Sequence, residues 1–126
     1  MCGTGILSEY IAKQQPKSLI GIDISEEQLR IYNRHFPNAT THCCSITNTP
    51  LEDNSVDIIG IYGGLHHVHP LFKNAITECH RILKPNGHLC IYEPQAHTIL
   101  EPIRKFWYSK DDEFNDNEQA INVTKL

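Results

Sequence analysis

The sequence lacks the features that mark membrane proteins, disulfide-stabilised proteins and nucleic-acid-binding proteins. None of its 126 residues belongs to an apolar run near the roughly 20 residues that cross a bilayer, so we expect no membrane span. The formal net charge of -4 argues against the clustered positive charge that nucleic-acid binding needs. The five cysteines are an odd number without the spacing of a disulfide framework. We therefore expect reduced thiols in a cytoplasmic protein.

What is present indicates one small α/β domain. Hydrophobic residues make up 40% of the chain and charged residues 21%, which is typical of a folded protein. The length allows a core but is short for a complete large α/β enzyme. Residue spacing predicts helices over 6–15, 25–36 and 71–83, and strands over 18–23, 40–45, 56–62 and 88–92. This alternation predicts a parallel sheet with helices on both faces.

Two of the predicted helices carry boundary signals. Ser25 is a good N-cap, and the acids that follow it belong in a first helical turn. The run Lys84-Pro85-Asn86-Gly87 predicts the end of the third helix, because glycine is favoured just past a helix C-terminus.

A glycine-rich turn opens the chain, and a carboxylate follows the first predicted strand. Gly3 and Gly5 precede a helix, so backbone amides there can approach an anionic ligand group. Asp23 could accept two hydrogen bonds from a ribose diol. A dinucleotide would favour G-x-G-x-x-G, but Ser8 stands where the last glycine belongs. S-adenosylmethionine would favour G-x-G-x-G, whose last two glycines are present.

The downstream segments CCSITNTPLEDNSVDIIGIYGGLHHV and ECHRILKPNGHLCIYEP, taken in order, resemble class I S-adenosylmethionine-dependent methyltransferases. The likeness is greatest to the small-molecule branch with the ubiquinone/menaquinone-type enzymes, and it covers about Met1 to Pro94. It implies a Rossmann-like three-layer αβα sandwich with a mostly parallel sheet. Residues 1–97 would form a partial S-adenosylmethionine-binding core, and residues 98–126 a helix or loop segment that starts a substrate lid.

The resemblance also implies roles for individual residues. The implied cofactor-binding positions are Gly3, Thr4 and Gly5 at the methionine end, Asp23 at the ribose hydroxyls, Ile24, Ser45 and Ile46 around adenine, and Tyr62 and Gly63 near the methionyl amine. Three positions depart from the family pattern. Met1 replaces the first glycine of the N-terminal turn, and Ser45 replaces an acid. Asn86 replaces a glycine in the later turn Lys84-Pro85-Asn86-Gly87, and asparagine can adopt the left-handed conformation that such a position needs.

Methyl transfer needs positioning and exclusion of water, and it needs a base only if the acceptor must lose a proton. His66 is the candidate base in the loop after the fourth family strand, and Tyr62 and Glu93 could also face the acceptor. Adjacent histidines cannot easily aim at one ion, so we expect no metal. This loop lacks the Asn-Pro-Pro-Tyr-type run of DNA amino-methyltransferases, which favours a small-molecule acceptor.

In the family fold, the first strand lies between the second and the fourth and carries the glycine turn. The sequence begins with the turn, and no confident strand pair follows Pro94, so we expect a chain truncated at both ends, with its first and last strands missing. Unpaired backbone groups beside that strand would each cost on the order of 1–3 kcal/mol. Two alternatives stay open: a non-catalytic methyltransferase remnant, and a fragment of an NAD-dependent oxidoreductase. The oligomeric state and the acceptor cannot be read from these residues.

Overall fold

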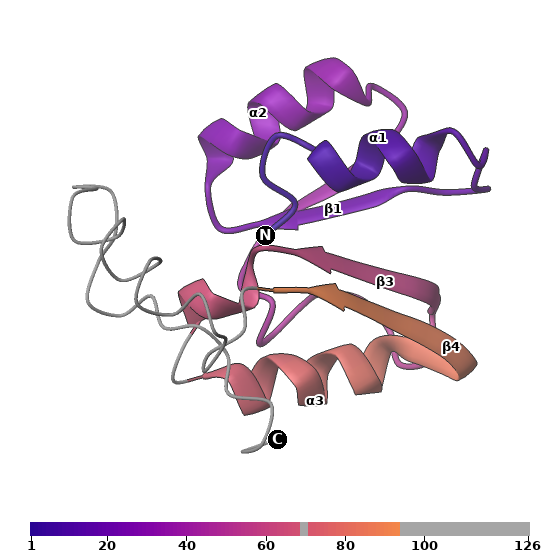
Figure 1. The fold of residues 1–126 in the computed structure, drawn as a ribbon, viewed down its shortest axis with the longest axis vertical. Helices are drawn as coiled ribbons and strands as arrows, with labels where there is room; N and C mark the ends of the chain where they lie inside the picture. Colours follow the sequence, from indigo (N-terminus) through magenta and orange to yellow (C-terminus); the bar gives the residue numbers. More distant parts are fainter. Residues whose placement is uncertain (69–70, 94–126) are drawn as a thin grey trace, which may run out of the picture.

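The computed structural model describes residues 1–68 and 71–93 (Figure 1). Its elements are α1 (Ile6–Ala12), β1 (Ile20–Asp23), α2 (Glu26–His35), β2 (Thr40–Cys43), β3 (Val56–Tyr62), the 3-10 helix η1 (Leu65–Val68), α3 (Phe72–Ile82) and β4 (Leu83–Tyr92). The predicted segment 98–126 lies outside the described residues. No helix within the described ranges is long and apolar enough to cross a membrane.

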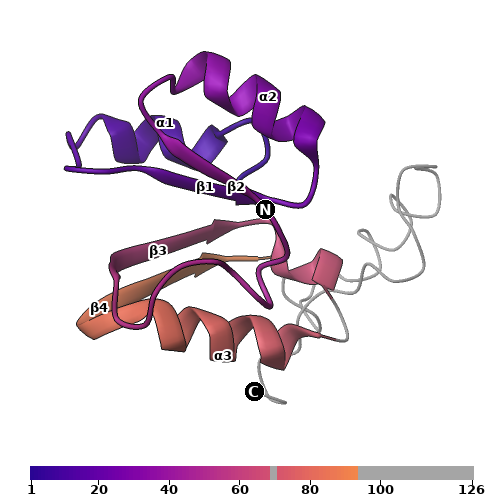
Figure 2. The same ribbon diagram turned by 180° about the vertical axis from the view of Figure 1, so that it is seen from behind.

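The predicted parallel strands are confirmed, and they form two separate pairs. β1 pairs with β2, and β3 pairs with β4, without ladder hydrogen bonds between the pairs. All four strands end on the same side of the molecule, near the N-terminus (Figures 1 and 2). In the described part of the chain, no strand lies between β1 and β3, the position that the resemblance gives to the first family strand.

Helices lie on both outer sides of these pairs. α1 and α2 lie beyond β1 and β2, and α3 lies beyond β3 and β4 on the opposite side (Figure 1). α1 also contacts β3, because the missing side chain of Gly60 lets Leu7 approach closely: an added Cβ would lie 2.6 Å from Leu7 Cδ2. A buried hydrophobic cluster includes part of α3 and comprises Ile46, Ile61, Leu65, Ala75 and Cys79.

The predicted start of α2 is confirmed, and α3 ends within one residue of its predicted end. The Ser25 hydroxyl accepts a hydrogen bond from the backbone N–H of Gln28, as an N-cap should. α3 ends at Ile82, and Leu83 is already extended and begins β4. Pro85 disfavours helical geometry at Lys84, the residue before it, and residues 84–87 belong to β4. Asn86 takes the left-handed conformation, with φ +66°, as its identity allowed.

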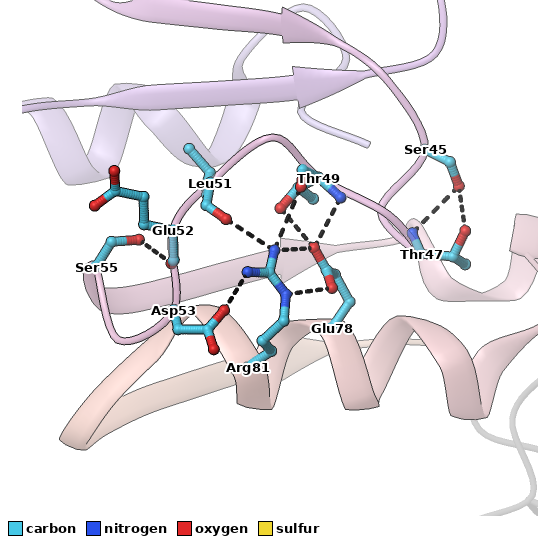
Figure 3. A network of polar contacts seen from close by, with 9 residues as sticks. All are labelled: Ser45, Thr47, Thr49, Leu51, Glu52, Asp53, Ser55, Glu78 and Arg81. Carbon is cyan, nitrogen blue, oxygen red and sulfur yellow. Dashed lines mark hydrogen bonds and ion pairs between the residues drawn. The ribbon is translucent and has the colours of Figure 1, made fainter.

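A charge network centred on the buried Glu78 fixes the segment between β2 and β3 to α3 (Figure 3). Glu78 is 8% exposed and accepts hydrogen bonds from the N–H and hydroxyl of Thr49, both at 2.7 Å. Arg81 donates to Glu78, to Asp53 and to the Leu51 carbonyl. The hydrogen bonds from Arg81 lower the pKa of Glu78 to about 2, against the opposing effect of burial.

Candidate functional site

The glycine turn lies at the C-terminal end of β1. Gly3 and Gly5 both have positive φ, +51° and +101°, which side-chain-bearing residues rarely adopt. A Cβ on Gly5 would overlap the ring of Phe36, so this glycine is required by packing as well as by conformation. A Cβ on Gly3 would meet no atom within 4 Å. The space beyond Gly3 is therefore open.

Asp23 closes the turn against β1. Its Oδ2 accepts hydrogen bonds from the N–H of Gly3 at 2.8 Å and from the Met1 amino group at 2.5 Å, and its Oδ1 accepts one from the N–H of Ser25 at 3.0 Å. Burial alone would raise the pKa of Asp23, but these hydrogen bonds outweigh it and lower the pKa. An ionised carboxylate has about four acceptor sites, so one remains for a ligand hydroxyl.

The residues assigned to adenine lie beside Asp23 but differ in exposure. Ile24 is 74% exposed and presents an apolar surface next to the carboxylate. The N–H of Cys44 donates to the Asp23 carbonyl at 3.0 Å, which brings the segment after β2 alongside β1. Ser45 Oγ accepts the N–H of Thr47 and is thus engaged in its own turn. The Ile46 side chain is buried in the core cluster and faces away from solvent.

An open hollow beside β2 does not include the glycine turn. A depression of about 510 Å³ lies against β2 and the following crossover, lined by residues 41–44 and 48–50. It contains none of the predicted site residues.

The ends of β3 and β4 meet next to the turn. Gly63 has φ +60° and open space beyond its Cα, like Gly3. Tyr62 and Tyr92 are opposite each other in the strand register, and their rings stack with centroids 5.0 Å apart. The Met1 side chain lies against Gly64 and packs on the core cluster, so the residue in place of the first turn glycine joins the two strand pairs.

His66 lies in η1 and is held by Glu93, which directly follows β4. His66 Nδ1 is 2.8 Å from Glu93 Oε2, while Glu93 Oε1 accepts the N–H groups of Gly64 and Leu65. The Glu93 and His66 side chains are only 4% and 13% exposed. Sequence reasoning named both residues but did not pair them. Among the described residues, no group of three His, Cys, Asp or Glu side chains is arranged to hold a metal ion.

Comparison with known proteins decides the family. The family model described as "Methyltransferase domain" matches residues 1–91. This chain belongs to the methyltransferase domain family. Its parallel strands with helices on both sides are the Rossmann-like arrangement of that family, and the family's cofactor is S-adenosylmethionine, as the resemblance implied. The methyltransferase family match accounts for the glycine turn without the alternative of an NAD-dependent oxidoreductase.

Relatives of this methyltransferase-family chain are longer than it is. It is 37% identical over 91 residues to an uncharacterized methyltransferase of Schizosaccharomyces pombe, covering 71% of this chain and 35% of the relative. It is 38% identical over 94 residues to a demethylmenaquinone methyltransferase of Chlamydia caviae, covering 72% and 40%. A solved S-adenosylmethionine-dependent methyltransferase of Methanosarcina mazei superposes with a TM-score of 0.73 at 26% identity, covering 87% and 57%. The chain thus spans less than half the length of these two curated relatives.

Proposed function

We propose that this chain binds S-adenosylmethionine at the common edge of its parallel strands and serves the transfer of its methyl group to a small molecule. The observation that carries the proposal is the hydrogen bond from Gly3 N–H to Asp23 Oδ2, which joins the glycine turn to the acidic strand end. Family membership supports the choice of cofactor.

The residues at this edge fit the cofactor chemically. Asp23 keeps an acceptor site for a ribose hydroxyl, and the exposed side chain of Ile24 offers an apolar surface to adenine. Gly3 and Gly63 leave open space where any other residue would place a Cβ, which suits the slender methionine part. The proposed cofactor-binding set is completed by Thr4, Gly5, Ser45, Ile46 and Tyr62. Ile46 would contribute through its backbone, and Gly5 by shaping the turn.

When bound, S-adenosylmethionine supplies a methyl group on a sulfonium that is already an activated leaving group. The chain's own contribution is orientation and exclusion of water. Asp23 and the glycine turn fix one end of the site, and the loop from Gly63 to His66 borders the other. We propose His66 as the base for an acceptor that must lose a proton.

The acceptor is proposed to be a small molecule that carries a flat ring. Two features support this: a relative is named a demethylmenaquinone methyltransferase, and Tyr62 and Tyr92 form an exposed aromatic pair at the same edge. Aromatic faces favour offset stacking with other rings. A cytoplasmic location is part of the proposal, because all five cysteines are free thiols, which a reducing compartment maintains.

Calorimetric titration of the purified chain with S-adenosylmethionine and with NAD tests the proposal. We expect heat from the first ligand alone. Binding of neither ligand would favour the non-catalytic alternative, and binding of NAD alone would favour an oxidoreductase. Transfer of radiolabelled methyl from S-adenosylmethionine to 1,4-dihydroxynaphthalene then tests the ring-containing acceptor, with 1,4-dimethoxynaphthalene, which lacks the acidic protons, as the matched control.

A further inference from the structure

The Glu93 carboxylate is a buried acceptor with three hydrogen-bond donors around it. It is 4% exposed, and its Oε1 lies 2.5 Å from Gly64 N and 2.6 Å from Leu65 N. Its Oε2 lies 2.8 Å from His66 Nδ1. Two backbone donors on one oxygen fix the rotation of the carboxylate, so the second oxygen is aimed at the imidazole.

This arrangement determines which nitrogen of His66 carries the proton. An ionised carboxylate can only accept, so Nδ1 must be the donor. In the neutral imidazole the lone pair then resides on Nε2, which has no hydrogen-bond partner among the described residues. The side chain keeps a 13% exposed fraction, so Nε2 is not sealed in the core.

We infer that Glu93 is a positioning residue that holds His66 in the Nδ1–H tautomer, so that Nε2 can take a proton from the methyl acceptor. This rests on the proposed function and adds the class of acceptor: one whose reacting atom carries an acidic proton, such as an aromatic hydroxyl. The acceptor proton moves to Nε2, and the electron pair that it leaves forms the bond to the methyl carbon. The electron pair of the broken carbon–sulfur bond stays on sulfur.

A purely structural role for Glu93 is the competing explanation, since the carboxylate also fixes the backbone at Gly64 and Leu65. Glu93→Gln separates the two roles. The amide oxygen of glutamine can still accept both backbone N–H groups, whereas its NH₂ group donates to Nδ1. His66 must then carry its proton on Nε2, so the backbone contacts survive while the tautomer reverses.

Nitrogen NMR of histidine-labelled full chain at pH 8.5, where a free imidazole is neutral, reads the tautomer directly. We expect His66 to show a protonated Nδ1 and an unprotonated Nε2 in the wild type, and the reverse in Glu93→Gln. Asp53→Asn, which removes an exposed carboxylate outside the site, should leave the wild-type pattern unchanged. A wild-type Nε2–H tautomer, or no reversal in the variant, would overturn the inference. If Glu93→Gln does not fold, the wild-type spectrum alone decides.

The tautomer of His66 read by NMR does not depend on whether the chain binds S-adenosylmethionine. Titration of Glu93→Gln with that ligand should give the wild-type Kd, because the substitution leaves the glycine turn and Asp23 intact. In the methyl-transfer assay, kcat for 1,4-dihydroxynaphthalene should fall by roughly 10²-fold or more with its KM unchanged. A rise in both Kd and KM with kcat retained would assign Glu93 a structural role and contradict the inference.

Discussion

Replacing Glu78 by glutamine removes the charge at the centre of the network in Figure 3 while preserving its shape. The amide can still accept from Thr49, but the ion pair with Arg81 at 2.6 Å is lost. The pKa of Glu78 falls from 4.5 to about 2, and each unit corresponds to about 1.4 kcal/mol, which gives an upper bound of about 3.5 kcal/mol. Because Arg81 is 33% exposed, solvent screening reduces this, and we expect a loss of about 2 kcal/mol at pH 7.

The dependence on pH gives the prediction a sign. A carboxyl whose pKa is lowered by folding stabilises the native state above its unfolded pKa, and this contribution is lost as the pH falls from about 4.5 to about 2. The wild type should therefore lose its advantage over Glu78→Gln through this window, and the two proteins should be equally stable near pH 2. Urea unfolding followed by far-ultraviolet circular dichroism at several pH values measures the difference.

Asp53→Asn is the matched control, because it removes the other carboxylate that contacts Arg81. Asp53 is 69% exposed, so its loss should cost less than about 1 kcal/mol. Equal losses for the two variants at pH 7, or a Glu78→Gln deficit that persists unchanged to pH 2, would refute the assignment of the stabilisation to the buried carboxylate.

The remaining predictions concern glycines and thiols. Gly5→Ala should lower the free energy of unfolding by about 3 kcal/mol, since it adds backbone strain and a clash with Phe36. Gly3→Ala should lower it by only about 1 kcal/mol, because an added Cβ there meets no atom. Urea unfolding compares the two variants, and similar losses would contradict the packing argument. Burial raises the pKa of Cys79 to about 11, so iodoacetamide at pH 8 should alkylate the exposed Cys43 and spare Cys79 in the native chain. Mass spectrometry of the peptides checks this, and early labelling of Cys79 would show that the core around α3 is open.

Local signals in the sequence predict most of the elements, because those signals act over a few residues. Val56–Tyr62 is a strand with the predicted bounds, and the Ser25 cap starts α2 as expected. The predicted end of α3 is correct to within one residue, but β4 begins at Leu83 and not at His88, and its register with β3 is irregular between these two residues. Which strand pairs with which depends on long-range contacts, which no local pattern encodes.

The site was predictable where a motif exists and not where a contact is long-range. Gly3 and Asp23 were named from spacing, and they are directly hydrogen-bonded. The pairing of His66 with Glu93 joins residues 27 positions apart, and only the parallel alignment of β3 and β4 brings them together. Ile46 was assigned to adenine from its position in the family pattern, but its side chain is buried in the core cluster.

The Kd of S-adenosylmethionine for Asp23→Asn, measured by calorimetry beside Asp57→Asn, tests the central claim most directly. Both variants lose one negative charge, but Asp57 pairs with Lys84 at the surface, away from the glycine turn. A lost hydrogen bond to a charged group corresponds to about 1.5–3 kcal/mol, so Asp23→Asn should weaken binding by roughly 10- to 100-fold while Asp57→Asn binds like the wild type. Equal affinity in all three proteins would contradict the account.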